Sequence, residues 1–122
     1  MGNKLTFEFK TKYSLEERQN MSNKLLREKP DFIPIICEPT PNSDLPPFKK
    51  TRYLVRKDMT ASELIATIRE KVILKEGTGL FLFTSKGKSL SGGITMMETY
   101  NINKDKEDNF LYVFCGGEVF MG

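Results

Sequence analysis

The sequence predicts a single α+β domain built on a four-stranded mixed sheet, and three observations support this class. The chain has 122 residues, a length that suits one hydrophobic core. Two segments carry a helix-capping pattern followed by apolar residues at helical spacing. Four short segments are either continuously apolar or alternate between apolar and polar residues, as strands do.

The first helix with clear signals is predicted over residues 14–28. Ser14 can cap it, and Glu17, three residues later, can accept a hydrogen bond from the backbone N–H of Ser14. Pro30 excludes helix beyond this point. The preceding residues 4–12 are basic with alternating Leu and Phe, and they are compatible with a short helix or an extended arm. The residues predicted to face inward from the helix are Leu15, Met21, Leu25 and Leu26.

Two strands follow, separated by a proline-rich loop. Residues 32–37 are almost all apolar and rich in isoleucine, which is typical of a buried strand. Pro34 is allowed there only where the ladder does not need its missing N–H. Residues 38–48 contain four prolines and predict a stiff loop. Residues 51–57 alternate and place two arginines on one face, so we expect an edge strand that its charge protects from stray pairing.

The second half of the chain adds a helix, a helical turn and two strands. Thr60 and Glu63 repeat the capping pattern, and apolar residues at helical spacing through Ile73 predict an amphipathic helix that Gly77 and Gly79 end. Further strands are predicted over residues 80–83 and 110–115, with one helical turn over residues 95–100. This order is that of a β-grasp domain, in which a right-handed crossover makes the last strand parallel to the first.

The composition excludes several classes of function. The absence of histidine removes Ser-His-Asp and Cys-His catalysis and the usual zinc sites, so we expect no enzyme, no catalytic residue, no metal site and no cofactor. A formal charge of +3 is too small to predict a nucleic-acid partner. Cys37 and Cys115 are too distant in sequence for a Cys-x-x-Cys motif, and reduced cytosolic thiols are expected. No apolar run approaches the roughly 20 residues that span a bilayer, and no signal peptide is evident, so a soluble chain is expected.

Several segments resemble the autophagy ubiquitin-like modifiers, the family that includes GABARAP and the microtubule-associated light chain three group. The segments are residues 29–38 (KPDFIPIICE), 50–55 (KTRYLV), 80–83 (LFLF) and 107–112 (EDNFLY), together with a chain that ends in glycine. They follow the family's order over nearly the whole chain. The resemblance implies one compact domain with three parts: an N-terminal helical subdomain with two helices over residues 1–30, a ubiquitin-like β-grasp core over residues 31–115, and a flexible conjugation tail over residues 116–122.

The resemblance also implies a reacting group at Gly122. In the family the terminal glycine is joined to phosphatidylethanolamine, which implies a cytoplasmic protein that moves to the autophagosome membrane after lipidation. The implied partners are the activating and conjugating enzymes of the autophagy system and a cysteine protease that processes the chain and removes the lipid. Glycine suits this chemistry because it has no Cβ to hinder approach to the carboxyl group. The family usually has an aromatic residue before this glycine, whereas Met121 stands here, so the preference of the protease is left open.

A peptide groove is the second site that the resemblance implies. An edge strand over residues 50–55 can accept an extended peptide by strand addition. The family's partners carry an aromatic and an aliphatic anchor three residues apart, with acidic flanks. By position, the aromatic pocket consists of Met21, Leu25, Pro34, Ile36, Arg52, Leu54 and Phe110. The aliphatic pocket consists of Tyr53, Val55, Met59, Leu64, Thr67 and Ile68, and the acidic flank would face Lys49, Lys50 and Arg52.

Two of these positions depart from the family. Met21 stands where a carboxylate is usual, so a hydrogen bond to an indole is not expected there. Thr67 replaces a usual aliphatic residue and makes the second pocket more polar.

Several alternatives stay open at this level. Leu64 and Ile68 can equally be core residues, and a basic strand can be no more than a solubilised edge. A ubiquitin-type end at residues 116–117 would leave under roughly 7 Å of chain beyond the last strand, too little to thread an enzyme channel. Gly2 fits an N-myristoylation pattern. The chain could also be a modifier of protein lysines, or an unconjugated β-grasp adaptor for trafficking or cytoskeletal partners.

Overall fold

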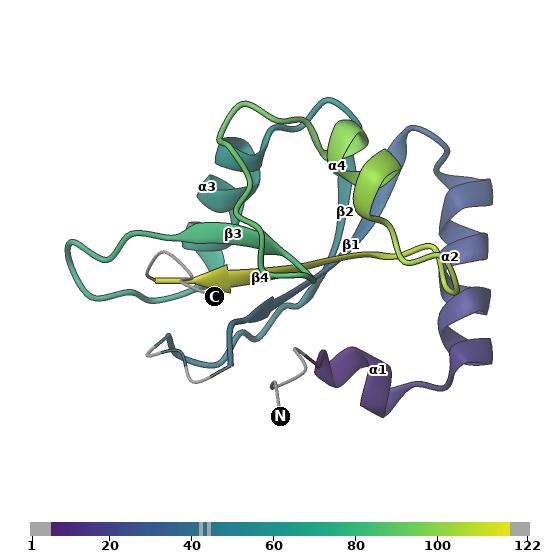
Figure 1. Ribbon diagram of the computed structural model, residues 1–122, viewed down its shortest axis with the longest axis horizontal. Coiled ribbons are helices and arrows are strands. Elements are labelled where there is room, and N and C mark those ends of the chain that lie inside the picture. Colours follow the sequence, from purple (N-terminus) through teal and green to yellow (C-terminus); the bar gives the residue numbers. More distant parts are fainter. Residues whose placement is uncertain (1–5, 42, 44, 118–122) are drawn as a thin grey trace.

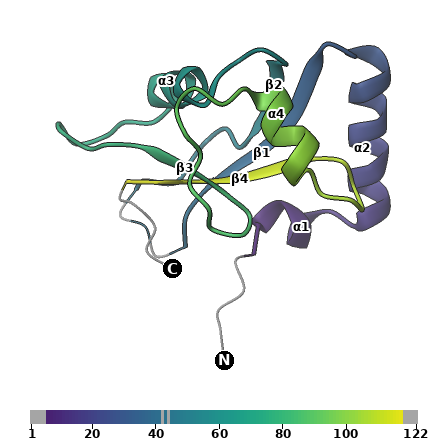
Figure 2. The same ribbon diagram turned by 45° about the horizontal axis from the view of Figure 1, so that its top comes forward.

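A four-stranded sheet lies between two pairs of helices (Figures 1 and 2). The computed structural model describes residues 6–41, 43 and 45–117. The strand order is β2-β1-β4-β3, and of its three pairings only β1 with β4 is parallel. This arrangement confirms the predicted α+β class, the four-stranded mixed sheet and the crossover to a parallel last strand. The elements are α1 (Glu8–Lys12), α2 (Leu15–Glu28), β1 (Phe32–Pro39), β2 (Arg52–Arg56), α3 (Ala61–Lys71), β3 (Phe81–Thr84), α4 (Met96–Asn103) and β4 (Leu111–Gly116).

Each face of the sheet has its own hydrophobic core. On one face, α3 contributes Leu64 and Ile68 and α4 contributes Met96, and all three side chains are fully buried. The other face is covered by α1 and α2 and is rich in aromatic residues. Phe7 stacks on Phe114 there with ring centroids 4.0 Å apart. The two N-terminal helices therefore stabilise the second face of the sheet, which would otherwise expose its aromatic side chains to water.

The helix starts agree with their capping patterns. The side chains of Ser14, Thr60 and Thr95 each accept the backbone N–H of the glutamate three residues later, and that glutamate accepts the cap residue's own N–H. The third of these boxes begins α4, which has eight residues and is longer than the single predicted turn. The ambiguous segment before Ser14 forms the short helix α1, so the two N-terminal helices that the resemblance implied are present.

Three local predictions are wrong. Leu15 is 36% exposed, and the buried residue of α2 is Ser22, whose hydroxyl donates to the backbone carbonyl of Asp108. Ile73 is 93% exposed because α3 ends at Lys71 and the chain becomes extended at Val72 (φ −125°, ψ 127°), which removes Ile73 from the helix stripe. The third strand begins at Phe81, one residue later than predicted.

Pro34 occupies the middle of the sheet without breaking a ladder. It lies opposite Leu54 of β2, while the pairing of β1 with β4 begins one residue later, at Ile35. The backbone N–H of Cys37 donates to the carbonyl of Thr51, 2.7 Å away, so the odd-numbered residues of β1 are the ones that bond β2. The missing N–H of Pro34 therefore removes no bond between β1 and β2.

A buried carboxylate attaches α2 to the start of β4. Asp108 is fully buried and accepts from the guanidinium of Arg18 at 2.6 Å, from the hydroxyl of Tyr112 at 2.5 Å and from the backbone N–H of Phe110 at 2.9 Å. Burial, together with the hydrogen bond to this carboxylate, raises the pKa of Tyr112 well above its ordinary value. The network fixes the position of α2 over the aromatic face, and hence one wall of the site described below.

Candidate peptide-binding edge

The outer edge of β2 carries main-chain groups that no other strand of the sheet uses. β2 is the first strand in the order and, among the described residues, pairs with no strand but β1. Since Thr51 bonds β1 through its carbonyl, the alternation of an antiparallel pair turns the N–H and C=O groups of Arg52 and Leu54 away from the sheet. These four groups form a short template on which an extended peptide can pair.

The side chains assigned to the aromatic pocket lie together on the α2 face. Ile36 and Phe110 are buried at its floor, and Met21 and Leu25 of α2 pack against them half-buried. Pro34 is buried, and Leu54 is half-buried beside it on β2. Arg52 is exposed at the rim, where a guanidinium nitrogen lies 3.8 Å from the sulfur of Met21. The list of seven residues thus divides into a buried floor, a partly open wall and a cationic rim.

The side chains assigned to the aliphatic pocket lie on the opposite face, in the core under α3. Leu64 and Ile68 are fully buried, and Tyr53 and Val55 are 5% exposed. The half-buried members of the set are Met59 and Thr67, and the hydroxyl of Thr67 donates to the backbone carbonyl of Glu63 at 3.0 Å. In the structure most of these side chains make core contacts, so a peptide side chain would reach only Met59 and Thr67 without displacing core atoms.

Tyr53 combines a buried ring with an unpartnered hydroxyl. The ammonium group of Lys50 lies 4.8 Å from the ring centroid, which fixes that lysine beside the edge strand. Burial raises the pKa of Tyr53 to about 12. Within the described part of the chain its hydroxyl oxygen has no hydrogen-bond partner.

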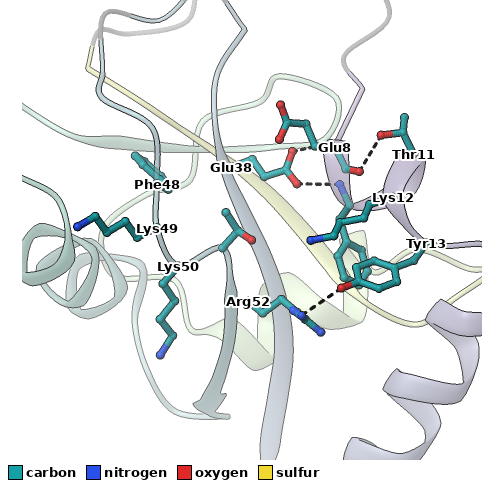
Figure 3. A pocket seen from close by; sticks show the side chains of 11 residues that line it. Glu8, Thr11, Lys12, Tyr13, Glu38, Phe48, Lys49, Lys50 and Arg52 are labelled. Atoms are coloured by element: carbon teal, nitrogen blue, oxygen red, sulfur yellow. Dashed lines mark hydrogen bonds between the residues drawn. The ribbon is translucent and has the colours of Figure 1, made fainter.

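A cavity of about 680 Å³ adjoins the aromatic pocket, and its lining has four cations and two carboxylates, Glu8 and Glu38 (Figure 3). Lys49, Lys50 and Arg52 line it from the β2 side, and Lys12 and Tyr13 line it from the end of α1. The guanidinium of Arg52 donates to the hydroxyl of Tyr13 at 3.3 Å and lies 5.4 Å from the centroid of that ring. The four cations of this wall are the charges that an acidic peptide flank would meet, each exposed pair contributing about 0.2–1 kcal/mol.

Glu38 closes the inner end of this cavity and holds α1 in place. Its two carboxylate oxygens accept hydrogen bonds from the backbone N–H groups of Glu8 at 2.8 Å and Phe9 at 3.0 Å (Figure 3). A β1 side chain thus satisfies two N–H groups at the start of α1 that have no acceptor within the helix. Burial raises the pKa of Glu38, and the two backbone hydrogen bonds partly oppose that rise. The cationic wall of the site therefore depends on a contact between segments about 30 residues apart.

Several residues of this cavity were missed by the sequence interpretation. Glu38, Lys12 and Tyr13 were not assigned to any site, because the segment before Ser14 had no decisive helical signal and a capping carboxylate on a distant strand leaves no local pattern. A signal did exist in Glu38 itself, since a charged residue that ends an otherwise apolar buried strand needs a partner. Lys49 and Lys50 were assigned to the acidic flank, and they line this cavity.

Gly122, the residue predicted to react, lies outside the described residues, and so does Gly2. The described chain reaches Gly117. Gly116 is the last residue of β4, and a Cβ there would lie 3.1 Å from the hydroxyl of Thr40, so this position has little room for a side chain. A diglycine end at residues 116–117 would therefore begin inside the sheet, which agrees with the argument against it.

Neither thiols nor metal ligands form a further site in the described ranges. Cys37 and Cys115 are both free and fully buried. The neighbouring thiol of Cys115, together with burial, raises the pKa of Cys37 above its ordinary value. Among residues 6–117, as far as they are described, no three metal-binding side chains gather, and no helix has the length and apolarity needed to cross a bilayer.

The fold and this edge define a ubiquitin-like β-grasp protein that carries two additional N-terminal helices. The family model described as "Autophagy protein Atg8 ubiquitin like" matches residues 17–122. The chain belongs to the Atg8 family, as the resemblance predicted. It is therefore a ubiquitin-like protein of autophagy.

Individual relatives agree over nearly the whole chain. Autophagy-related protein 8 of Mycosarcoma maydis is 33% identical over 114 residues, which are 93% of this chain and 95% of that protein. Autophagy-related protein 8c of Arabidopsis thaliana is 36% identical over 115 residues, with 93% and 94% covered. The crystal structure of Trypanosoma brucei ATG8 matches with a TM-score of 0.86 at 32% identity, covering 96% of this chain and 99% of that chain.

Proposed function

We propose that this protein is a modifier rather than an enzyme, and that its Gly122 carboxyl group is joined to phosphatidylethanolamine during autophagosome formation. An activating enzyme would form an adenylate and then a thioester of that carboxyl group, and the lipid amine would displace the thiolate. The five residues beyond Gly117 can span up to roughly 17 Å when extended, a reach that suits an enzyme's active cysteine. Two acyl chains would then anchor the protein stably, where a single chain is marginal.

The partners follow from this chemistry. Activating and conjugating enzymes would act on the tail, and a cysteine protease would process it and later release the lipid. The protein would be cytoplasmic before conjugation and on the autophagosome membrane afterwards. Membership of the Atg8 family supports this assignment, because its members work in the autophagy system.

We further propose that the β2 edge recruits cargo receptors or adaptors that carry an aromatic-x-x-aliphatic motif. The observation that carries this half of the proposal is the outward direction of the main-chain groups of Arg52 and Leu54. A spacing of three is odd, so in an added strand the two anchors point to opposite faces of the sheet. The aromatic anchor would then meet the wall formed by Met21 and Leu25, and the aliphatic anchor would meet the α3 side near Met59 and Thr67.

Reconstitution on liposomes tests the conjugation. Wild-type protein, incubated with the autophagy activating and conjugating enzymes, ATP and liposomes that contain phosphatidylethanolamine, should give a product of altered mobility on a denaturing gel. Phospholipase D should abolish the shift, and Gly122→Ala should prevent it. A shifted product that resists phospholipase D and contains a second protein would instead identify a modifier of protein lysines. No product at all would contradict conjugation and leave an unconjugated adaptor.

Nuclear magnetic resonance with a Trp-x-x-Leu peptide that has acidic flanks tests the edge. Peptide binding should protect the amide hydrogens of Arg52 and Leu54 from exchange, whereas Tyr53, which already bonds β1, should change little. Arg52→Glu should weaken binding roughly five- to tenfold, since it replaces one attraction with a repulsion. Arg56→Glu is the matched control on the same strand and face. Equal affinity for the peptide and its double-alanine version would contradict the groove.

A further inference from the structure

A second cavity, of about 570 Å³, lies on the aromatic face away from the β2 edge. It is bounded by α1, by the turn after β3 and by the segment between α4 and β4. Figure 2 shows that turn beside α1. The side chains that matter here are Lys10, Lys86, Ile102, Lys104, Asp105 and Lys106.

The lining of this cavity carries an excess of positive charge. Four lysines and one aspartate line it, a net charge of +3. Lys10 is neutralised locally, because its ammonium group lies 2.6 Å from the carboxylate of Asp105. The ammonium groups of Lys86, Lys104 and Lys106 make no ion pair with any described carboxylate, although that of Lys104 lies 5.4 Å from the centroid of the Tyr100 ring. Three cations without an ion pair around one hollow create a positive potential that attracts a multiply charged anion.

The backbone holds these lysines on tight turns. On the β3 side, Thr84 donates to the carbonyl of Lys88 at 2.8 Å, and Gly87 supplies the positive φ of 86° that the turn needs. On the β4 side, the carboxylate of Asp105 accepts the backbone N–H groups of Glu107 at 2.8 Å and Asp108 at 3.1 Å. The lysines therefore lose little backbone freedom when a ligand binds.

An exposed apolar side chain stands at the rim. Ile102, on α4, is 76% exposed although it is large and aliphatic. It lies within four residues of two of the unpaired lysines. An aliphatic side chain beside a basic cluster is typical of surfaces that rest on anionic membranes, where the cations meet phosphates and the apolar group enters the acyl boundary.

We propose that this cavity binds the phosphate-bearing headgroup of an anionic phospholipid through Lys86, Lys104 and Lys106, with Ile102 inserted into the bilayer surface. Lysine rather than arginine suits this ligand, because an ammonium group is a compact point charge that needs no planar bidentate partner. The exposed isoleucine favours a lipid over a phosphorylated peptide. This contact is separate from conjugation at Gly122, and it is expected of the unconjugated chain.

Vesicle binding of the purified, unconjugated chain tests the proposal. It should sediment with vesicles of phosphatidylcholine and phosphatidic acid, and not with phosphatidylcholine alone. Replacing all three lysines by glutamine (Lys86→Gln, Lys104→Gln, Lys106→Gln) should weaken binding about 100-fold, given about fivefold for each lysine. Ile102→Ser should weaken vesicle binding about tenfold, which corresponds to the lower end of the free energy gained when an aliphatic side chain of this size is fully buried. Circular dichroism of each variant should match wild type, because all four side chains are exposed.

A triple variant of equal charge separates a site from diffuse attraction. Lys24→Gln, Lys71→Gln and Lys75→Gln change three exposed lysines outside the cavity and should have a much smaller effect. Equal losses in the two triple variants would overturn the proposal. So would binding of inorganic phosphate in the cavity without any preference for anionic vesicles, or tighter binding of an acidic phosphopeptide than of the vesicles. None of these results bears on conjugation, which is measured separately.

Discussion

Neutralising Asp108 should destabilise the fold more than any surface charge change. Asp108→Asn keeps the size of the side chain but leaves the guanidinium of Arg18 without its countercharge, and the side chains of this pair are 0% and 11% exposed. Breaking a buried ion pair typically costs about 3–5 kcal/mol. Arg18 keeps a hydrogen bond to the carbonyl of Tyr13 at 3.2 Å, so we expect the lower end, about 3 kcal/mol. The total free energy of unfolding of a domain of this size is about 6–18 kcal/mol, so this loss would be a large part of it.

Urea unfolding at neutral pH measures this effect as a lower midpoint. Arg18→Met should also lower the free energy of unfolding. The loss in the double variant Arg18→Met/Asp108→Asn should be smaller than the sum of the two single losses by at least about 1 kcal/mol, because the two groups interact directly. Asp58→Asn is the matched control, since its partner Arg56 lies 3.5 Å away and both are largely exposed, and it should change stability by under about 0.5 kcal/mol. A loss from Asp108→Asn as small as that of the control would refute the reasoning.

Three further predictions concern single side chains. Tyr53→Phe should raise the free energy of unfolding by about 1 kcal/mol, because it removes a buried hydroxyl that has no partner among the described residues. Tyr112→Phe should lower it by about 1–2 kcal/mol, because it removes the hydroxyl that donates to Asp108. Urea midpoints that move in the same direction in the two variants would contradict this. Burial opposes ionisation of Asp105, but Lys10 and two backbone N–H groups lower the pKa of its carboxyl group overall. The ionised carboxylate should therefore stabilise the fold fully above a pH of about 4 and lose that effect on further acidification. The difference in unfolding free energy between wild type and Asp105→Asn should accordingly shrink from pH 4 to pH 2. Glu38→Gln should increase amide exchange in α1 while leaving α3 unchanged, and uniform exchange would argue against the capping role.

Local signals were sufficient for most of the fold. The capping residues Ser14 and Thr60 marked helix starts because both halves of a capping box lie within four residues of each other. The alternation around Tyr53 marked an edge strand with one buried and one cationic face. These features depend on interactions between near neighbours, which a single sequence records.

The features that sequence reasoning missed depend on distant contacts. The helix α1 has five residues, too few for its own periodicity, and it is held by Glu38 from β1. Ile73 followed the helical spacing, yet the backbone leaves the helix before it. Ser22 is buried because it meets the carbonyl of Asp108, 86 residues away. None of these contacts leaves a pattern within one segment.

The candidate site was predicted unevenly for a related reason. Positions carried over from the family identified the strand and the α2 wall, and the structure brings these residues together. The family positions could not distinguish residues that line a pocket from residues of the core. Leu64 and Ile68 of α3 were assigned to a pocket, but both are fully buried. Exposure depends on how tightly α3 packs against the sheet, which the residue types alone do not specify.

Imaging of starved cells tests the central claim most directly. Wild-type protein and Gly122→Ala, each labelled at the N-terminus, should be compared before and during starvation. We expect wild type to move from a diffuse cytoplasmic distribution to membrane-bound puncta, and the variant to stay diffuse although it still binds the Trp-x-x-Leu peptide. Puncta of equal number and intensity in the two strains would contradict attachment through the terminal carboxyl group.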